Sequence, residues 1–239
     1  MLSNTKAIVL HSLKYGEQSI IVDMLTESFG RTSFIIRIPK TSRGKLKKQF
    51  FQPLTLLDIE LDYRPRMQLQ HLRDARLSTA FVSIPFSPAK LSIAMFLSEF
   101  LIHATKNEAE NSHLFEFVEK SIIYLDSVES GYANFHLIFM LRFSMFVGFY
   151  PNLDDADKDI FFDLREGSFT SMIPPHPDFL VQEEAKSIKL LMRLSYSTMH
   201  LFSITRAQRN RITEVILWYY RLHVPSFPEL KSLPVLQSL

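Results

Sequence analysis

The chain has 239 residues, of which 46% are hydrophobic and 22% are charged, a composition typical of one large globular domain or two small ones. It contains no apolar run long enough to cross a bilayer and no signal-peptide pattern, so we expect a cytoplasmic protein. The absence of cysteine excludes disulfides, thiol nucleophiles, iron–sulfur clusters and thiolate zinc sites.

The charge is unevenly distributed along the chain. Residues 1–79 contain 13 Lys/Arg and 7 Asp/Glu, a net charge of +6, whereas residues 80–239 contain 14 and 18, a net charge of −4. This division predicts two domains with different partners, the first of which faces a polyanion. The alternative is a chance distribution of ordinary surface charge.

The first 80 residues have the short apolar and alternating segments of β-strands. Gly30 lies in a turn that favours positive φ, and Pro39 ends the third segment. Five short strands in about 75 residues fit a small Greek-key barrel such as an OB-fold, although an SH3-like barrel fits the strand count nearly as well. The predicted strands are Lys6–Leu10, Ser19–Leu25, Thr32–Ile38, Leu54–Leu61 and Met67–Arg73.

Beyond residue 80 the hydrophobic period becomes helical. Ser87 precedes Pro88, a cap followed by the proline of a first helical turn, and Thr205 is a second predicted N-cap. The third helix is apolar nearly all round, which is typical of the central helix of a bundle. The predicted helices begin at Pro88 and span about Ser112–Asp126, Tyr132–Phe149, Gln182–Leu194 and Thr205–Leu222.

The segment from Pro151 to Pro177 is irregular, and its pattern predicts a hairpin of Ile160–Leu164 and Ser168–Met172. We therefore predict an α+β chain of two domains. The first, residues 1–79, is a five-stranded OB-fold β-barrel, and the second, residues 80–239, is an all-α domain with a short β-hairpin insertion near residues 154–172.

A basic segment, residues 40–48, is the strongest local signal for a ligand. Five of its nine residues are cationic and no acid interrupts them: Lys40, Arg43, Lys45, Lys47 and Lys48. Cations on a surface free of carboxylates suit the phosphates of nucleic acid, and the segment falls in a loop between two predicted barrel strands. Four further cations extend the candidate patch: Arg31, Arg37, Arg64 and Arg66. The alternative is a solvated loop that keeps the protein soluble.

Exposed aromatic side chains could add base stacking to this patch. The candidates are Phe34, Phe50, Phe51 and Tyr63. The chain has 21 Phe, however, so most of them must be buried in the core and burial is the stronger interpretation for each candidate.

Motifs of catalysis and of metal binding are weak or absent. The acidic run Asp155–Asp159, with Asp163 and Glu166, resembles the start of a calcium loop, but Ile160 stands where that loop needs Gly. The eight histidines form no HExxH motif, and no nucleophile or phosphate-binding glycine motif is present. We expect a protein without catalytic activity and without a metal or other cofactor.

Several segments, taken in order along nearly the whole chain, resemble the RecO family of bacterial DNA repair proteins. The family opens its OB-fold with an apolar strand, a Glu-x-Ser turn, a second apolar strand, and then Thr and Gly-Arg. The matching segments are Lys6–His11, Tyr15–Asp23, Leu25–Glu27 and Phe29–Arg31, then Phe51–Leu54, Gly148–Leu153, Tyr219–His223, Leu230–Ser232 and Leu236.

This resemblance implies an OB-fold followed by a helical domain and a role in recombinational DNA repair. It implies binding to single- and double-stranded DNA, strand annealing, and loading of recombinase onto DNA coated with single-strand-binding protein, in the cytoplasm at the nucleoid. The implied partners are RecR and the acidic tail of the single-strand-binding protein. The basic loop supplies the implied DNA contacts, and Arg142 is the implied contact for the tail; the alternative for Arg142 is pairing with a local carboxylate.

One departure concerns zinc. Many members of the family carry a four-cysteine zinc module after the segment that matches Pro151–Leu153. This chain has no cysteine, and the corresponding region is Asp154–Met172. We therefore expect no zinc and a segment held by its own packing.

Two other functions remain open. One is a protein–protein scaffold whose barrel does not bind DNA, and the other is a metal-dependent nuclease that uses scattered Asp and Glu side chains.

Overall fold

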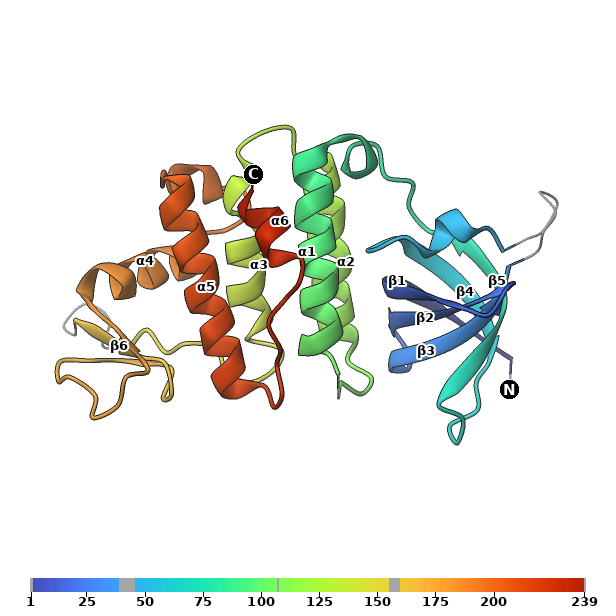
Figure 1. Cartoon of the computed structure of the whole chain (residues 1–239), viewed down its shortest axis with the longest axis horizontal. Coiled ribbons are helices and arrows are strands. Elements are labelled where there is room, and N and C mark those ends of the chain that lie inside the picture. Colours follow the sequence, from blue (N-terminus) through green and yellow to red (C-terminus); the bar gives the residue numbers. More distant parts are fainter. Residues whose placement is uncertain (1, 39–45, 107, 155–159, 239) are drawn as a thin grey trace. The chain divides into compact units, whose positions relative to one another are not determined.

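A computed structural model describes residues 2–38, 46–106, 108–154 and 160–238. The chain divides into two compact units (Figure 1). The first unit comprises residues 1–127 and 230–238, and the second comprises residues 128–229 and residue 239. The predicted boundary at residues 79 and 80 separates strands from helices, because β5 ends at Leu77 and α1 begins at Pro88. The two compact units instead divide after Ser127, which is the last residue of the second long helix.

The first unit contains a closed five-stranded barrel, as predicted for an OB-fold, in the order β1-β2-β3-β5-β4. Only the β3–β5 pair is parallel, and β4 returns to pair with β1. The strands are β1 (Leu2–Tyr15), β2 (Ser19–Thr26), β3 (Gly30–Arg37), β4 (Leu56–Asp62) and β5 (Leu69–Leu77).

The interior of the barrel is built from alternate residues of its strands, because successive side chains of a strand point to opposite faces. Val9, Val22, Phe34 and Leu61 are fully buried in this core. The short helix η1 (Lys48–Phe51) lies between β3 and β4 in the chain, and Phe51, only 1% exposed, anchors it in the barrel core.

Two helices and a short terminal helix complete the first unit: α1 (Pro88–Ala104), α2 (Ser112–Ser127) and α6 (Leu233–Gln237). Lys6 Nζ on β1 lies 2.9 Å from Glu119 Oε1 on α2, and the Ser98 hydroxyl on α1 donates a hydrogen bond to the Leu10 carbonyl. Gly30 has φ +62°, and a Cβ there would meet the backbone of Ala109 at 2.5 Å. Glycine is therefore required where the barrel meets the loop after α1.

A buried carboxylate fixes the connection from the barrel to α1, which includes the short helix η2 (Ile84–Phe86). Asp126, at the end of α2, accepts hydrogen bonds from the amides of Val82, Ser83 and Ile84 at 2.8–2.9 Å. The ammonium group of the buried Lys90 donates to the Ser83 hydroxyl at 2.6 Å and to the Asp126 carbonyl at 3.0 Å. The start of α1 is thus fixed to the end of α2.

The second unit consists of helices and one small sheet. Its helices are η3 (Tyr132–Asn134), α3 (Phe135–Phe143), α4 (Gln182–Arg193), η4 (Met199–Leu201) and α5 (Arg206–His223). Its sheet has the order β7-β6-β8 and is formed by β6 (Phe161–Asp163), β7 (Ser168–Thr170) and β8 (Phe179–Leu180). The β6–β7 hairpin was predicted, whereas β8 was not.

Helix α3 is buried on nearly all of its surface, as predicted for a central helix, but it is shorter than expected. The predicted segment continued to Phe149, whereas α3 ends at Phe143. The Ser144 hydroxyl donates to the Leu141 carbonyl, and the Met145 amide donates to the Arg142 carbonyl. Gly148 has φ +85°. These bonds tighten the chain into a turn.

Strand limits also differ from the prediction. β1 begins at Leu2, because residues 2–8 pair with β4 in a register that local hydrophobicity does not reveal. β4 begins at Leu56, since Leu54 has φ +60° and donates its amide to the Val9 carbonyl at 2.7 Å. Helix α6 was not predicted.

In the part of the chain that the structure describes, no helix combines the length and the hydropathy that crossing a membrane requires.

Candidate nucleic-acid interface

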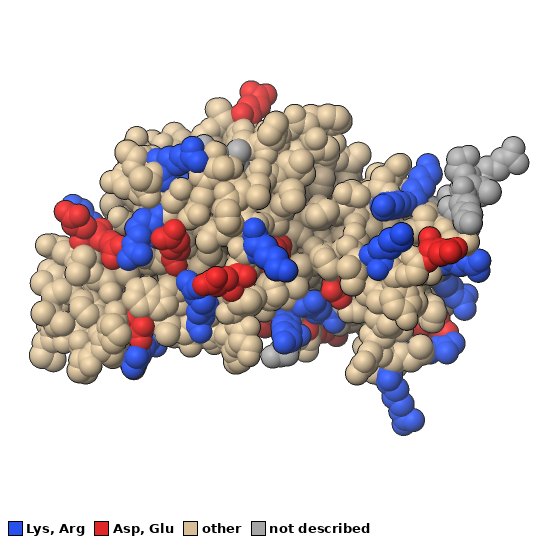
Figure 2. Space-filling model, in the orientation of Figure 1, with Lys and Arg blue, Asp and Glu red and all other residues tan. Residues whose placement is uncertain are grey.

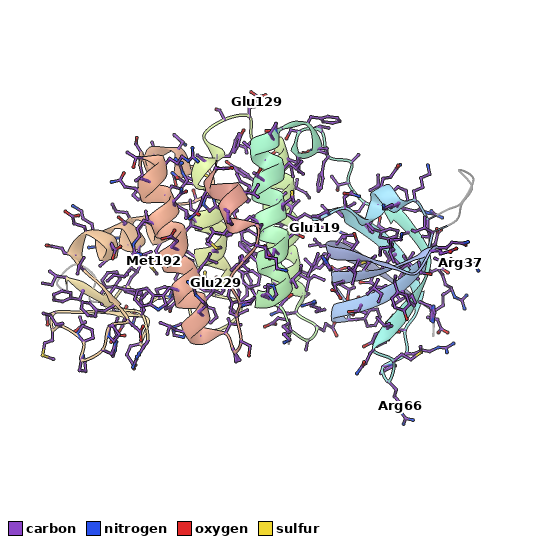
Figure 3. The ribbon with its side chains drawn as sticks, in the orientation of Figure 1. Arg37, Arg66, Glu119, Glu129, Met192 and Glu229 are labelled. Carbon is purple, nitrogen blue, oxygen red and sulfur yellow. The ribbon has the colours of Figure 1, made fainter. Side chains whose placement is uncertain are left out.

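The barrel fixes the two segments that flank the predicted basic loop. Arg37 is the last residue of β3 and is exposed, and the amide of the next residue, Ile38, donates to the Gln18 carbonyl at 2.8 Å. Leu46 packs on the barrel core from the other side of the loop. Both flanks therefore adjoin the barrel, and Figure 3 shows Arg37 at the barrel end that lies away from α1 and α2.

Two of the predicted loop cations are described, and both are exposed. Lys47 is the N-cap of η1, where its carbonyl accepts the Phe50 amide at 3.0 Å, and Lys48 is the first residue of the helix. Since Phe51 is buried in the core, these two ammonium groups lie on an anchored turn. Lys40, Arg43 and Lys45 lie outside the described residues.

The cations of the β4–β5 turn lie apart from Arg37. Gln70 is buried and its amide group donates to the carbonyls of Arg64 and Met67 at 2.9 and 2.7 Å, which fixes the turn. The Arg64 guanidinium lies 3.2 Å from Asp62 Oδ2. Arg66 is exposed at the tip of this turn and is well separated from Arg37 in Figure 3. Arg64 and Arg66 would therefore meet a different part of a bound strand from Arg37.

Arg31 has another role. Its side chain is only 16% exposed and lies 3.4 Å from Asp23 Oδ2. It also donates to the Ile102 carbonyl on α1, and its amide donates to the Glu108 carbonyl at 3.2 Å. Arg31 thus ties β3 to the end of α1, and we leave it out of the interface.

Two of the four aromatic candidates are fully buried, as the stronger interpretation predicted. Phe34 and Phe51 are 0% and 1% exposed because both point into the barrel, so neither can contact a base. Phe50 is partly buried against the core, and Tyr63 stacks on Phe29 with ring centroids 4.1 Å apart.

Tyr15 is the exposed aromatic side chain of the barrel that this selection missed. It is 55% exposed at the end of β1, next to the β1–β2 turn at Gly16. Its position between a strand and a glycine was the available signal, since turn residues at the end of a hairpin face solvent.

The barrel has two surfaces of opposite electrostatic character. A hollow of about 560 Å³ lies over β1, β4 and β5 and is lined by Asn4, Thr5, Lys6, Glu27, Asp58, Ile59, Glu60, Asp74, Ala75 and Arg76. Its four carboxylates against two cations disfavour a phosphate backbone. Figure 2 shows Lys and Arg more frequent than Asp and Glu on the face of the barrel in view. The exposed cations Arg37, Lys47 and Lys48, which flank the predicted basic loop, are therefore the better candidates for nucleic-acid contacts.

Arg142 lies on α3 in the second unit. Its guanidinium donates to the Leu194 carbonyl, 2.9 Å away, at the C-terminal end of α4. A cation there is favourable because the last carbonyls of a helix carry partial negative charge. Arg142 therefore ties α3 to α4, and its role in receiving a partner's tail stays a prediction.

Among the described residues, no group of three His, Asp or Glu side chains is placed to hold a metal ion. The acidic run 155–159, which prompted the calcium hypothesis, lies outside the described residues. Asp163, the ninth position of that hypothetical loop, accepts the amides of Arg165 and Glu166 at 2.8 and 3.2 Å, and Asp163 Oδ2 lies 3.2 Å from His176 Nε2. Its oxygens fix the β6–β7 turn.

Two family models match the chain, Recombination protein O N terminal over residues 1–81 and Recombination protein O C terminal over residues 85–234. The chain belongs to the RecO family. The DNA repair protein RecO of Phocaeicola vulgatus is 47% identical over 239 residues, covering all of this chain and 99% of the relative. Those of Bacteroides fragilis and Flavobacterium psychrophilum are 46% and 33% identical, again over the whole of this chain. RecO proteins act in DNA repair and recombination, so the barrel and the helical region belong to a DNA repair protein.

Proposed function

We propose that the chain is a recombination mediator that binds single- and double-stranded DNA and promotes strand annealing. With RecR, it helps to load recombinase onto DNA coated with single-strand-binding protein. Membership of the RecO family supports this proposal, and the observation that carries it is the exposure of Arg37, Lys47 and Lys48 on both flanks of the predicted basic loop. In the part of the chain that the structure describes, these three cations form no ion pair with a carboxylate.

The proposed activity is binding and positioning, and no covalent bond is made or broken. Protein cations contact phosphates and release condensed counterions, so affinity falls steeply as salt rises. Such contacts carry little sequence information, and we expect weak sequence selectivity. No cofactor takes part in this proposal.

The test is a fluorescence-anisotropy titration of a labelled single-stranded oligonucleotide at several salt concentrations. We expect salt-sensitive binding by the wild type and at least a tenfold loss in the triple variant Arg37→Glu, Lys47→Glu, Lys48→Glu. The matched control reverses three cations of α4, Lys186→Glu, Lys189→Glu and Arg193→Glu, with the same change in net charge. It should retain nearly all of the affinity. Circular dichroism checks that both variants fold.

Each other outcome supports a different function. No binding by the wild type at low salt would favour the scaffold, and equal losses in both variants would show a response to net charge without a site on the barrel. Cleavage of the oligonucleotide that depends on added Mg²⁺ would favour the nuclease.

The partner proposals have separate tests. RecR binding is measured by size-exclusion chromatography with the two proteins mixed, and tail binding by titration with a peptide that ends in the acidic, apolar tail of single-strand-binding protein. A hollow of about 350 Å³ between α4 and α5 has an apolar floor that includes Ile188 and Ile212, but Glu183 and Glu184 line it. Carboxylates there disfavour an acidic tail, so Arg142→Ala should weaken tail binding more than Glu183→Ala does.

A further inference from the structure

One face of the barrel carries a row of side chains that spans three strands. Tyr15 on β1 pairs with Ser19 on β2, and Ser19 pairs with Arg37 on β3. Directly paired residues of antiparallel strands project to the same side of the sheet. The neighbouring residues Ile20 and Ile36 are buried, so this row faces outward. Ser19, between them, is the smallest side chain of the row, and the Arg37 guanidinium donates to Gln18 Oε1 at 3.3 Å.

The next outward-facing row is apolar. Leu13 pairs with Ile21, and Ile21 pairs with Ile35. Each of these residues lies two positions from the first row on its own strand. Leu13 is 56% exposed, and the two isoleucines are partly exposed. We call the six residues of these two rows the Tyr15 surface: Leu13, Tyr15, Ser19, Ile21, Ile35 and Arg37.

Two carboxylates border this face: Glu17, exposed in the β1–β2 turn two residues after Tyr15, and Asp23. Asp23, in the row beyond, lies 3.4 Å from the Arg31 guanidinium and accepts a hydrogen bond from the Ser33 hydroxyl. His11 Nδ1 lies 4.0 Å from it. The Tyr15 surface thus combines an exposed aromatic side chain, aliphatic side chains and one cation, and of the two bordering acids Asp23 is paired with Arg31.

We propose that the Tyr15 surface stacks the bases of single-stranded DNA, with Tyr15 against a base and Arg37 at the adjacent phosphate. This inference rests on the proposed function and adds a strand preference to it. Stacking on an aromatic ring needs an unstacked base, which a single strand offers and an intact duplex does not. Leu13, Ile21 and Ile35 extend the apolar surface on which the neighbouring base lies.

The test compares three labelled ligands in anisotropy titrations: a 20-nucleotide oligothymidine, a 20-position abasic strand with the same phosphates, and a 20-base-pair duplex. Tyr15→Ala should weaken binding to oligothymidine by about 5- to 20-fold, in keeping with the loss of stacking at one base. Its binding to the abasic strand and the duplex should change by less than about twofold. Tyr15→Phe keeps the ring and should retain the wild-type preference.

The matched control is Phe86→Ala, which removes an exposed aromatic side chain, 81% exposed, from another surface of the same unit. It should leave all three affinities unchanged. A second readout is photo-crosslinking of oligothymidine that carries 5-iodouracil, followed by mass spectrometry of the peptides. We expect a crosslink at Tyr15.

The outcomes separate this inference from the proposed function. If the wild type binds oligothymidine and Tyr15→Ala binds it equally well, the stacking surface is wrong and the DNA-binding function stands. Equal losses on all three ligands also overturn it, because they indicate a phosphate contact or a folding defect. Loss of RecR binding alone would assign the surface to a protein partner. If the wild type binds none of the ligands, both proposals fail.

Discussion

The barrel of the first unit and the small sheet of the second are stabilised in different ways. In the barrel every strand has two neighbours, and the inward side chains form a continuous core. The strands of the small sheet have two or three residues, too few to form such a core. Phe162 of β6 instead packs on Phe169 and on Tyr219 of α5, with ring centroids 4.9 and 6.0 Å apart.

This difference determines which side chains are available for a ligand. A closed barrel needs only one face of its strands for stability, so the outward face of β1, β2 and β3 can bind a partner. The small sheet uses its aromatic side chains for its own support, and Asp163 is engaged in fixing its turn. We therefore expect substitutions on the outer face of the barrel to change binding and substitutions in the small sheet to change stability.

The largest effect should follow the loss of Phe162, which is 1% exposed. We expect Phe162→Ala to lower the free energy of unfolding of the second unit by about 3–5 kcal/mol, because a large buried ring leaves a cavity. Ile21→Ala, on the outer face of the barrel, should cost about 1 kcal/mol, since that side chain is only partly buried.

Urea denaturation measures both changes. The chain has a single tryptophan, Trp218 on α5, whose fluorescence reports on the second unit, while circular dichroism follows the whole chain. A loss below about 1 kcal/mol for Phe162→Ala would mean that the small sheet does not depend on its aromatic support.

Local signals in the sequence predicted the parts of the fold that depend on local chemistry. The five strands and the caps Ser87 and Thr205 follow from hydrophobic period and from side chains that bond their own helix. The apolar run to Val147 conceals the local turn at Ser144 that ends α3. The short β8 depends on its pairing with β6, and α6 depends on its packing against α1. No local pattern contains that information.

The candidate site follows the same rule. The exposure of Lys47 and Lys48 was expected because cations seldom become buried. Phe34 and Phe51 could be listed as stacking candidates, although burial was favoured, because alternation gives two faces of a strand without saying which one the barrel encloses. Arg31 bonds to Ile102, 71 residues away, and Tyr15 gains its neighbour Arg37 only through the pairing of three strands.

The next largest effect should be a different response of the two units to acid. His136 on α3 is fully buried, and burial lowers its pKa to about 3, with a further contribution from the Arg209 guanidinium. Its Nε2 lies 3.1 Å from the Thr213 hydroxyl, which itself donates to the Arg209 carbonyl, so His136 donates to Thr213. The folded second unit therefore holds a neutral imidazole.

The sign of the pH dependence follows from that lowered pKa. An unfolded histidine titrates near pH 6.5, so the unfolded chain binds the proton first as the pH falls. The stability that depends on neutral His136 is complete above pH 6.5 and is lost as the pH falls toward 3. The loss is about 1.4 kcal/mol per pH unit, or about 3 kcal/mol by pH 4.

The Asp126 carboxylate of the first unit should respond at lower pH than His136. Burial alone would raise the pKa of Asp126, but hydrogen bonds from the amides of Val82, Ser83 and Ile84 lower it overall. Its contribution is present above an unfolded pKa near 3.8 and is lost only below that value.

Urea titrations at pH 7, 6 and 5, followed by Trp218 fluorescence, should show the second unit weakening in this range. A His136→Gln variant should show a shallower slope, and an unchanged slope would contradict the assignment to His136.

The smallest effects should distinguish the two helix caps. Thr205 and Gln208 form a reciprocal box at the start of α5: the Thr205 hydroxyl accepts the Gln208 amide at 3.2 Å, and the Gln208 side-chain oxygen accepts the Thr205 amide at 2.9 Å. Ser87 makes one longer bond at the start of α1, where its hydroxyl accepts the Lys90 amide at 3.4 Å. The box satisfies two helix-end amides, whereas the single cap satisfies one.

Thr205→Ala should therefore lower the free energy of unfolding by about 1 kcal/mol and Ser87→Ala by about 0.5 kcal/mol. Urea denaturation measures both, with Trp218 fluorescence for α5 and circular dichroism for α1. The start of α1 is also fixed by the Asp126 carboxylate and by the Lys90 ammonium group, neither of which bonds the Ser87 hydroxyl, so the loss of that cap leaves the helix tied to α2. A larger cost for Ser87→Ala would mean that the cap, and not the buried Asp126 carboxylate, holds the connection between the barrel and its first helix.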